Sequence, residues 1–299
     1  MKQFIALFFF GILCVTSKAQ ENNQPKDSTK VEALGTVFLK SVRVDADSPI
    51  THSNVLKEEL TQRNLGQDLP ILLNYLPAVV TTSDAGAGVG YTGIRVRGSD
   101  ATRVNVTING IPYNDSESQG TFWVNLPDFT SSVESLQLQR GVGTSTNGSG
   151  AFGASLNILT DGISEEAFAE VSNSYGSFET FRHTLRFSTG RLNDRYEFSG
   201  RLSKIASDGY IDRATSDLKS YFVQGTYSHE NTLIKLLAFG GKERTYQAYF
   251  GIDAATLESD RRFNPAGLYT TDDGEVRFLR QRSGRLYPGS SATGLEPTL

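Results

Sequence analysis

The segment from Phe181 to Ser203 alternates apolar and polar side chains with a period of two, which is typical of β-strands and not of helices. A turn at Asn193 and Asp194 divides it into two halves. The segment therefore predicts a hairpin with one apolar and one polar face. The first set is Phe181, His183, Leu185, Phe187, Tyr196, Phe198, Gly200 and Leu202, and the second is Arg182, Thr184, Arg186, Ser188, Glu197, Ser199, Arg201 and Ser203.

The same alternation returns after a polar loop at residues 207–217, where Tyr221, Val223, Gly225 and Tyr227 share one face of a strand and Phe222, Gln224 and Thr226 share the other. Long hairpins with short turns at one end and polar loops at the other predict the wall of an outer-membrane β-barrel, in which alternate side chains face lipid and lumen. A soluble two-layer β-sandwich has the same alternation and remains an alternative at this point.

The first 19 residues predict a secretory signal peptide, because they combine Lys2, an apolar run from Phe4 to Val15 and small residues near Ala19. The run is shorter than the roughly 20 apolar residues of a spanning helix, so we expect cleavage rather than anchoring. The only cysteine, Cys14, lies inside this signal, which leaves the exported chain without a thiol.

Residues 20–44 predict a linker, polar at first and then strand-like in the stretch LGTVFLKSVRV. The β-branched and aromatic side chains of that stretch are spaced for a strand that could add to the sheet edge of a partner.

Residues 45–162 predict a small α+β domain, a mixed sheet with short helices. Leucines at helical spacing predict one or two short helices that pack on the sheet, interrupted by Pro70 and ended by Pro77. Strand-like segments follow at 93–98, 103–112, 132–141 and 154–160, with loops rich in Gly, Ser, Asn and Asp between them. The leucines are Leu65, Leu69, Leu72, Leu73 and Leu76.

Gly148, Gly150 and Gly153 have the spacing of a dinucleotide-binding turn, G-x-G-x-x-G. That turn must open a helix, whereas Gly153 leads into the strand-like ASLNILT, and no phosphate-binding lysine follows Gly148. We therefore expect the glycines to serve a tight connection between two strands.

The residues give little reason to expect nucleic-acid binding, a metal or cofactor site, or catalysis. With 29 basic and 33 acidic residues the net charge of −4 gives no reason to expect nucleic acid. The three histidines are far apart, so we expect no metal site and no cofactor. Neighbouring carboxylates at 114–118 and 271–275 lie in turns without a nucleophile–base pair, so we expect no enzyme.

Four segments, GIRVRG, VTINGIPYND, SSVESLQLQRG and GSGAFGASLNILT, occur in the order and spacing of a TonB-dependent receptor plug domain. The resemblance covers about Asp45 to Gly162, and residues 163–299 resemble the first barrel hairpins of ferric-chelate and vitamin receptors of the Bacteroidetes type. The chain departs from the pattern at Gln137 and Gln139, where a carboxylate is usual, and at 154–155, where a glycine pair is common.

The resemblance implies a 22-stranded barrel in the cell outer membrane, closed by the plug, with substrate bound above it and TonB driving import. Expected partners are the TonB complex, an iron chelate and outer-membrane lipid. It implies a TonB box at Leu34, Gly35, Thr36, Val37, Phe38 and Leu39. It also implies plug–barrel charge contacts at Arg95, Arg97, Glu134 and Arg140, and substrate contacts at Tyr91, Tyr113, Phe122 and Trp123. Solvation of those charges and packing of those aromatic rings are the competing interpretations.

The expected cargo is a siderophore or ferric citrate, with cobalamin or another nutrient as the alternative. A secreted β-rich adhesin is the competing class. Twenty-two strands of about 10 residues need roughly 220 residues before any loop, more than the chain has after Gly162, so we expect the N-terminal part of a longer receptor with an incomplete barrel.

Overall fold

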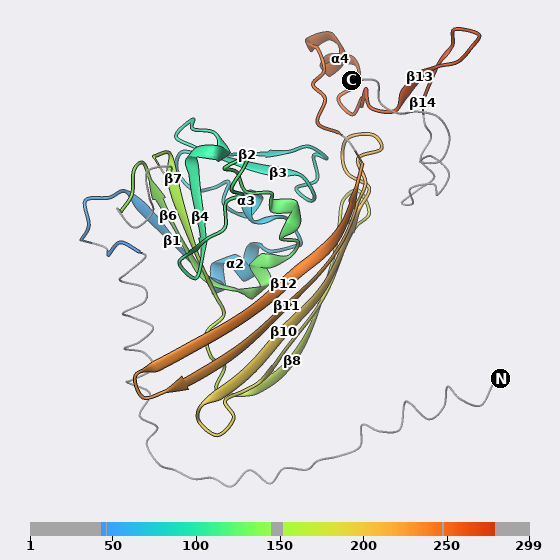
Figure 1. Ribbon diagram of the computed structural model, residues 1–299. Helices are drawn as coiled ribbons and strands as arrows, with labels where there is room; N and C mark the ends of the chain where they lie inside the picture. Colours follow the sequence, from blue (N-terminus) through green and yellow to red (C-terminus); the bar gives the residue numbers. More distant parts are fainter. Residues whose placement is uncertain (1–42, 46, 145–151, 247, 279–299) are drawn as a thin grey trace, which may run out of the picture.

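The computed structural model describes residues 43–45, 47–144, 152–246 and 248–278 (Figure 1). The predicted signal peptide, the TonB-box segment 34–39 and the glycines at 148 and 150 lie outside these residues. The described chain forms a compact N-terminal domain seated over a long curved sheet, with a short segment beyond the last long strand (Figure 1).

The N-terminal domain, called the plug below, is built on a mixed five-stranded sheet in the order β1-β6-β7-β4-β5. Strands β4 and β7 are parallel, and the other neighbours are antiparallel. The strands are β1 (His52–Leu56), β4 (Val104–Ile108), β5 (Ile111–Pro112), β6 (Val133–Arg140) and β7 (Ala154–Thr160). The hairpin of β2 (Val79–Ser83) and β3 (Thr92–Val96) stands apart from this sheet. The helical elements are α2 (Lys57–Arg63), α3 (Leu69–Leu72), η1 (Ala101–Arg103), η2 (Trp123–Asn125) and η3 (Phe129–Ser132).

The plug core joins side chains of α2 and α3 to the central strands, including Leu60, Leu69, Leu136 and Ile158. Pro70 lies in the first turn of α3 and does not interrupt it, because a fixed φ and a missing N–H suit that position. Leu65, predicted on the apolar helix face, is 62 % exposed. The four predicted strand segments are confirmed, whereas α2, β1 and β2 were not predicted.

Strand β7 begins directly after Gly153, so the prediction that this glycine opens a strand rather than a helix is confirmed. A Cβ at Gly153 would lie 2.7 Å from the Cβ of Ser99 and 2.8 Å from the carbonyl oxygen of Arg103. Close backbone approach is therefore the reason for glycine here.

The second sheet, called the wall, has the order β12-β11-β10-β9-β8, with every strand antiparallel to its sequence neighbour. The strands are β8 (Ala167–Gly176), β9 (Thr180–Thr189), β10 (Tyr196–Ser207), β11 (Ser216–His229) and β12 (Thr232–Thr245). The predicted turn between β9 and β10 has Asn193 and Asp194 at φ 51° and 54°, which suits a tight hairpin. Strands β13 (Leu268–Thr270) and β14 (Val276–Phe278) and helix α4 (Ala254–Ser259) follow β12.

The wall buries its polar face and exposes its apolar face. Phe198 and Leu202 are each 54 % exposed, whereas Glu197 and Arg201 on the same strand are 1 % and 2 % exposed. A soluble sandwich buries the apolar face, so this inversion contradicts the sandwich and defines part of a barrel wall with lipid outside. Five strands leave that barrel open (Figure 1).

In the described part of the chain, no helix is both long enough and apolar enough to cross a membrane.

Candidate functional site: the contact between plug and wall

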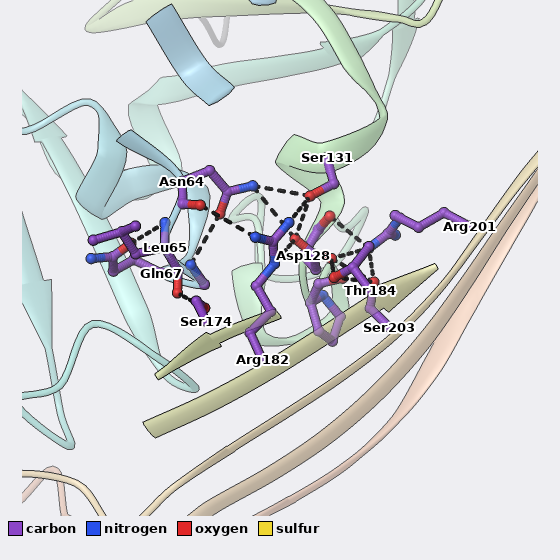
Figure 2. Close-up of polar contacts among 12 residues, drawn as sticks. Asn64, Leu65, Gln67, Asp128, Ser131, Ser174, Arg182, Thr184, Arg201 and Ser203 are labelled. Carbon is purple, nitrogen blue, oxygen red and sulfur yellow. Dashed lines mark hydrogen bonds and ion pairs between the residues drawn. The ribbon is translucent and has the colours of Figure 1, made fainter. Parts of the chain in front are cut away.

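Asp128 is the centre of the contact between the plug and the wall. It precedes η3 in the left-handed conformation, at φ 53° and ψ 22°, which aspartate tolerates better than most residues. Its side chain is fully buried. This geometry turns the carboxylate out of the plug and toward strands β9 and β10 (Figure 2).

Four side chains converge on the Asp128 carboxylate from the wall. Arg182 Nε donates to Oδ1 at 3.1 Å, and Thr184 Oγ1 donates to Oδ2 at 2.6 Å. Ser203, directly opposite Thr184 in the β9–β10 register, also donates to Oδ2. Arg201 Nη1 lies 3.3 Å from Oδ2. Because these residues occupy alternate positions of two paired strands, the strand period itself directs them to one point.

The two arginines also bind plug groups around Asp128. Arg182 donates to Ser131 Oγ at 2.6 Å and to the carbonyl oxygen of Asn64 at 3.3 Å. Arg201 donates to Ser132 Oγ at 3.0 Å and to the Asp128 carbonyl oxygen at 2.6 Å. Each guanidinium thus binds both a carboxylate and neutral acceptors. These additional hydrogen bonds offset part of the desolvation penalty of the buried charge pair.

Burial by itself would raise the pKa of Asp128, but Arg201, Arg182 and the hydrogen bonds from Ser131 and Ser203 outweigh it and hold the pKa below its ordinary value. The carboxylate is therefore ionised at neutral pH and both ion pairs are formed.

A second polar contact holds the end of the plug at Asp161, just beyond β7. The Asp161 carboxylate pairs with Arg186 of the wall at 2.8 Å and with Lys57 of α2 at 2.6 Å. Its carbonyl oxygen accepts from Gln224 at 2.9 Å and from Lys235 at 2.8 Å. Three wall strands thus hold the point where the chain leaves the plug.

An aromatic cluster completes the contact beside Asp128. The ring of Phe129 lies 5.9 Å from that of Phe222 and 5.3 Å from that of Phe239, both in edge-to-face geometry, and Tyr113 lies 6.1 Å from Phe239. Phe222 and Phe239 occupy inward positions of β11 and β12, so the wall supplies apolar as well as polar partners to the plug.

At the loop end of the wall, the plug turn at Ala85 contacts the loop between β10 and β11. The Ala85 carbonyl oxygen accepts from the backbone N–H groups of Tyr210 at 2.8 Å and Ile211 at 3.1 Å. Beside it lies a cavity of about 350 Å³. Its lining is Asp84, Ala85, Tyr91, Ser216, Thr245, Tyr246, Ala248 and Tyr249.

The four aromatic residues predicted to contact substrate lie in different places. Tyr91 lines the cavity just described, and Tyr113 packs on Phe239. Phe122 is 48 % exposed, whereas Trp123 is 3 % exposed and belongs to the plug core. Trp123 packs in the plug core in this structure, and substrate contact by the four residues stays a prediction.

The four charges predicted to bridge plug and barrel are also dispersed. Arg140 donates to the Pro77 carbonyl oxygen at 2.8 Å and to Ser53 Oγ at 2.7 Å, and Glu134 pairs with Lys57 at 3.5 Å, so both are bound within the plug. Burial and the nearby Arg97 lower the pKa of Arg140. Arg95 and Arg97 are exposed. Contact of these four with other parts of a barrel stays a prediction.

Gln137, noted as a departure from the plug pattern, binds the start of the described chain. Its amide accepts from the Val44 N–H at 2.9 Å and donates to the Val44 carbonyl oxygen at 2.9 Å, as a paired strand would. It also donates to Asn54 Oδ1 at 2.8 Å and accepts from Gln139 Nε2 at 2.9 Å. A carboxylate could make only the two accepting bonds.

A folded domain held by buried ion pairs against the polar inner face of a curved sheet with an apolar outer face defines a plugged transmembrane β-barrel. The family model of the TonB-dependent receptor plug domain matches residues 45–155. Residues 45–155 thus match a TonB-dependent receptor plug domain, and the strands that follow them form an open part of a barrel wall.

Among known proteins, the chain is 23 % identical over 232 residues to the probable TonB-dependent siderophore receptor PirA of Acinetobacter baumannii, covering 73 % of this chain and 28 % of that protein. It is 25 % identical over 179 residues to the vitamin B12 transporter BtuB of Vibrio cholerae, covering 60 % and 28 %. The unliganded ferric citrate transporter FecA has a similar fold, with a TM-score of 0.58 at 15 % identity, covering 72 % of this chain and 34 % of that structure. The chain therefore spans less than a third of the length of these curated relatives.

Proposed function

We propose that this chain is the plug and first wall segment of an outer-membrane receptor that imports an iron chelate with energy supplied through TonB. The observation that carries the proposal is the plug seated on the lumen face of the wall through Asp128 and Asp161. Such a plug blocks diffusion through the barrel, so passage of a ligand requires that these contacts be rearranged.

The cargo is proposed from the relatives and from the cavity at the loop end. PirA is named as a siderophore receptor and FecA as a ferric citrate transporter. The cavity has three tyrosines and one carboxylate among its lining residues, an aromatic surface suited to a chelate of moderate size. Cobalamin is the second candidate, because BtuB of Vibrio cholerae is named as a vitamin B12 transporter.

The coupling segment is proposed to be residues 34–39, which precede the Val44 anchor by a few residues. The test is made in the intact receptor, in cells grown under iron limitation. Deletion of 34–39 should abolish uptake of labelled ferric siderophore or ferric citrate without lowering the amount of receptor in the outer-membrane fraction. A matched deletion of 22–27 in the polar linker should leave uptake near the wild-type rate.

Three results would contradict the proposal or redirect it. Receptor-dependent uptake that survives deletion of 34–39 would contradict coupling through this segment, and the absence of any receptor-dependent uptake would favour the adhesin, which needs no energy coupling. Uptake of labelled cobalamin but not of iron chelates would establish the second candidate. Recovery of the intact protein outside the outer-membrane fraction would contradict the location itself.

A further inference from the structure

The outer face of the wall has three basic residues in one continuous cross-strand row. In the strand register, Lys204 of β10 lies directly opposite Lys219 of β11, and Lys219 lies directly opposite Lys242 of β12. On the other side, Lys204 lies opposite His183 of β9, which lies opposite Asn173 of β8. All three lysines and the histidine are exposed. We call Lys204, Lys219 and Lys242 the lysine row.

The lysine row has no internal compensation for its charge. Like charges directly opposite one another destabilise a sheet, and here two such pairs are adjacent. Among the residues that the structure describes, none forms an ion pair with a lysine of the row. The nearest outward carboxylate on the same strands is Asp217, which lies directly opposite Arg244 in the next row. An external anion would relieve this repulsion.

The row lies at the border between the apolar face and the loops. On its turn side the next register row is Val171, Leu185, Leu202, Tyr221 and Gly240. On its loop side the next row is Tyr175, Phe181, Ala206, Asp217 and Arg244, close to the loop at 208–215. In a barrel of this kind the short turns are periplasmic and the longer loops are extracellular. The row therefore faces the headgroup level of the outer leaflet.

We propose that the lysine row binds the phosphorylated headgroup of an outer-leaflet glycolipid. Neighbouring strands are about 4.8 Å apart, so the three lysines span about 10 Å along the sheet, a width that suits a headgroup with two phosphates. The acyl chains would lie on the apolar row below. This inference rests on the proposed outer-membrane location but not on the cargo or on energy coupling.

The surface beside the row is hollowed on its loop side. A cavity of about 430 Å³ is lined by Lys204, Phe181, Asp217 and Arg244, among others. Sugar hydroxyls would find carboxylate acceptors there while phosphates stay at the lysines. If the three lysines only extended toward water, they would not bind a phosphate. Lipid binding would then not depend on the headgroup.

The test uses the intact receptor in detergent and native mass spectrometry, with bisphosphorylated lipid A and its dephosphorylated form as probes. The triple variant K204Q/K219Q/K242Q should bind the bisphosphorylated lipid at least about tenfold more weakly, since each surface cation contributes about 1 kcal/mol toward an anionic lipid. The matched triple K204R/K219R/K242R keeps the charges and should bind like the wild type. The single variant K219Q should show a smaller loss and serves if the triple variant does not fold.

The proposal would be overturned if the glutamine variant, folded by the heat-shift of its barrel on gels, bound both lipids as the wild type does. It would also be overturned if inorganic phosphate displaced the lipid at equal concentration, since the row would then be a site for free phosphate. Chelate uptake measured on the same variants separates this result from the transport proposal, because lipid binding and uptake need not fail together.

Discussion

Arg201 of strand β10 reaches across the interface and holds Asp128 of the plug twice, through the carboxylate at 3.3 Å and through the carbonyl oxygen at 2.6 Å. Both side chains are buried. Burying a charge pair carries a desolvation penalty, and removing one partner destabilises the protein further because it leaves a buried charge unpaired. The plug is thus held by a contact whose strength depends on both partners being present.

Replacement of Asp128 by Asn should loosen the plug strongly. The variant leaves Arg182 and Arg201 without a buried counter-charge, and loss of one partner of such a pair costs about 3–5 kcal/mol. Hydrogen exchange of the intact receptor should show faster exchange at η3 and β6, and large antibiotics should enter cells more easily. Glu58→Gln, at an exposed plug charge on α2, is the control and should change neither readout. Unchanged exchange in Asp128→Asn would show that the neutral hydrogen bonds alone seat the plug.

The effects of replacing Asp128 and Arg201 on the free energy of plug opening should also be strongly non-additive. Removing Asp128 alone leaves Arg182 and Arg201 unpaired, whereas removing Arg201 as well leaves only Arg182 unpaired. The double variant should therefore cost less than the sum of the single variants, by about 1–3 kcal/mol. The measurement is a double-mutant cycle of D128N and R201Q on the free energy of plug opening from hydrogen exchange. The cycle of D128N with R191Q, whose arginine pairs with Glu165 instead, should add within about 0.5 kcal/mol. Equal coupling in both cycles would contradict a direct pair.

The wall residues that contact Asp128 could be predicted from the sequence, whereas the role of Asp128 itself could not. A period of two places Arg182, Thr184, Arg201 and Ser203 on the polar face without any knowledge of the fold. Asp128 lies in a loop with no period, and its left-handed backbone and its partners more than fifty residues away are products of tertiary packing. The same limit applies to Gln137, whose partner is Val44.

Asp68 should make the plug less stable as the pH rises, whereas Asp128 should make it more stable. Burial raises the pKa of Asp68 well above its ordinary value, against the hydrogen bonds from Thr92 and Gly90, and Oδ1 has no hydrogen-bond partner among the described residues. A carboxyl group whose folded pKa is raised costs stability above that pKa, and the cost disappears as the pH falls to the unfolded value of about 3.9.

Asp68→Asn should therefore stabilise the plug above the raised pKa of Asp68, and its advantage over the wild type should shrink as the pH is lowered through that pKa toward the unfolded value of about 3.9. The measurement is plug opening by hydrogen exchange across that range, corrected for intrinsic exchange rates. Asp272→Asn, in the exposed loop before β14, should follow the wild-type profile at every pH. An advantage that is constant with pH would mean that the amide packs better rather than that a charge was removed.

Gln137→Glu should release the first described residues from the plug sheet, although it is isosteric. The carboxylate would lose the hydrogen bonds donated to the Val44 carbonyl oxygen and to Asn54, and it would place a charge at a side chain that is 2 % exposed. Each buried polar group left unpaired costs about 1–3 kcal/mol. Trypsin should therefore cleave after Arg43 faster in the intact receptor. Gln67→Glu is the matched control, because among the described residues Gln67 accepts a bond from the Leu65 N–H and donates none, and a carboxylate can still accept that bond. If both variants were cleaved at the wild-type rate, the amide of Gln137 would not be what holds Val44, and Arg43, through its bonds to Ser135 and Asn157, would have to be the anchor.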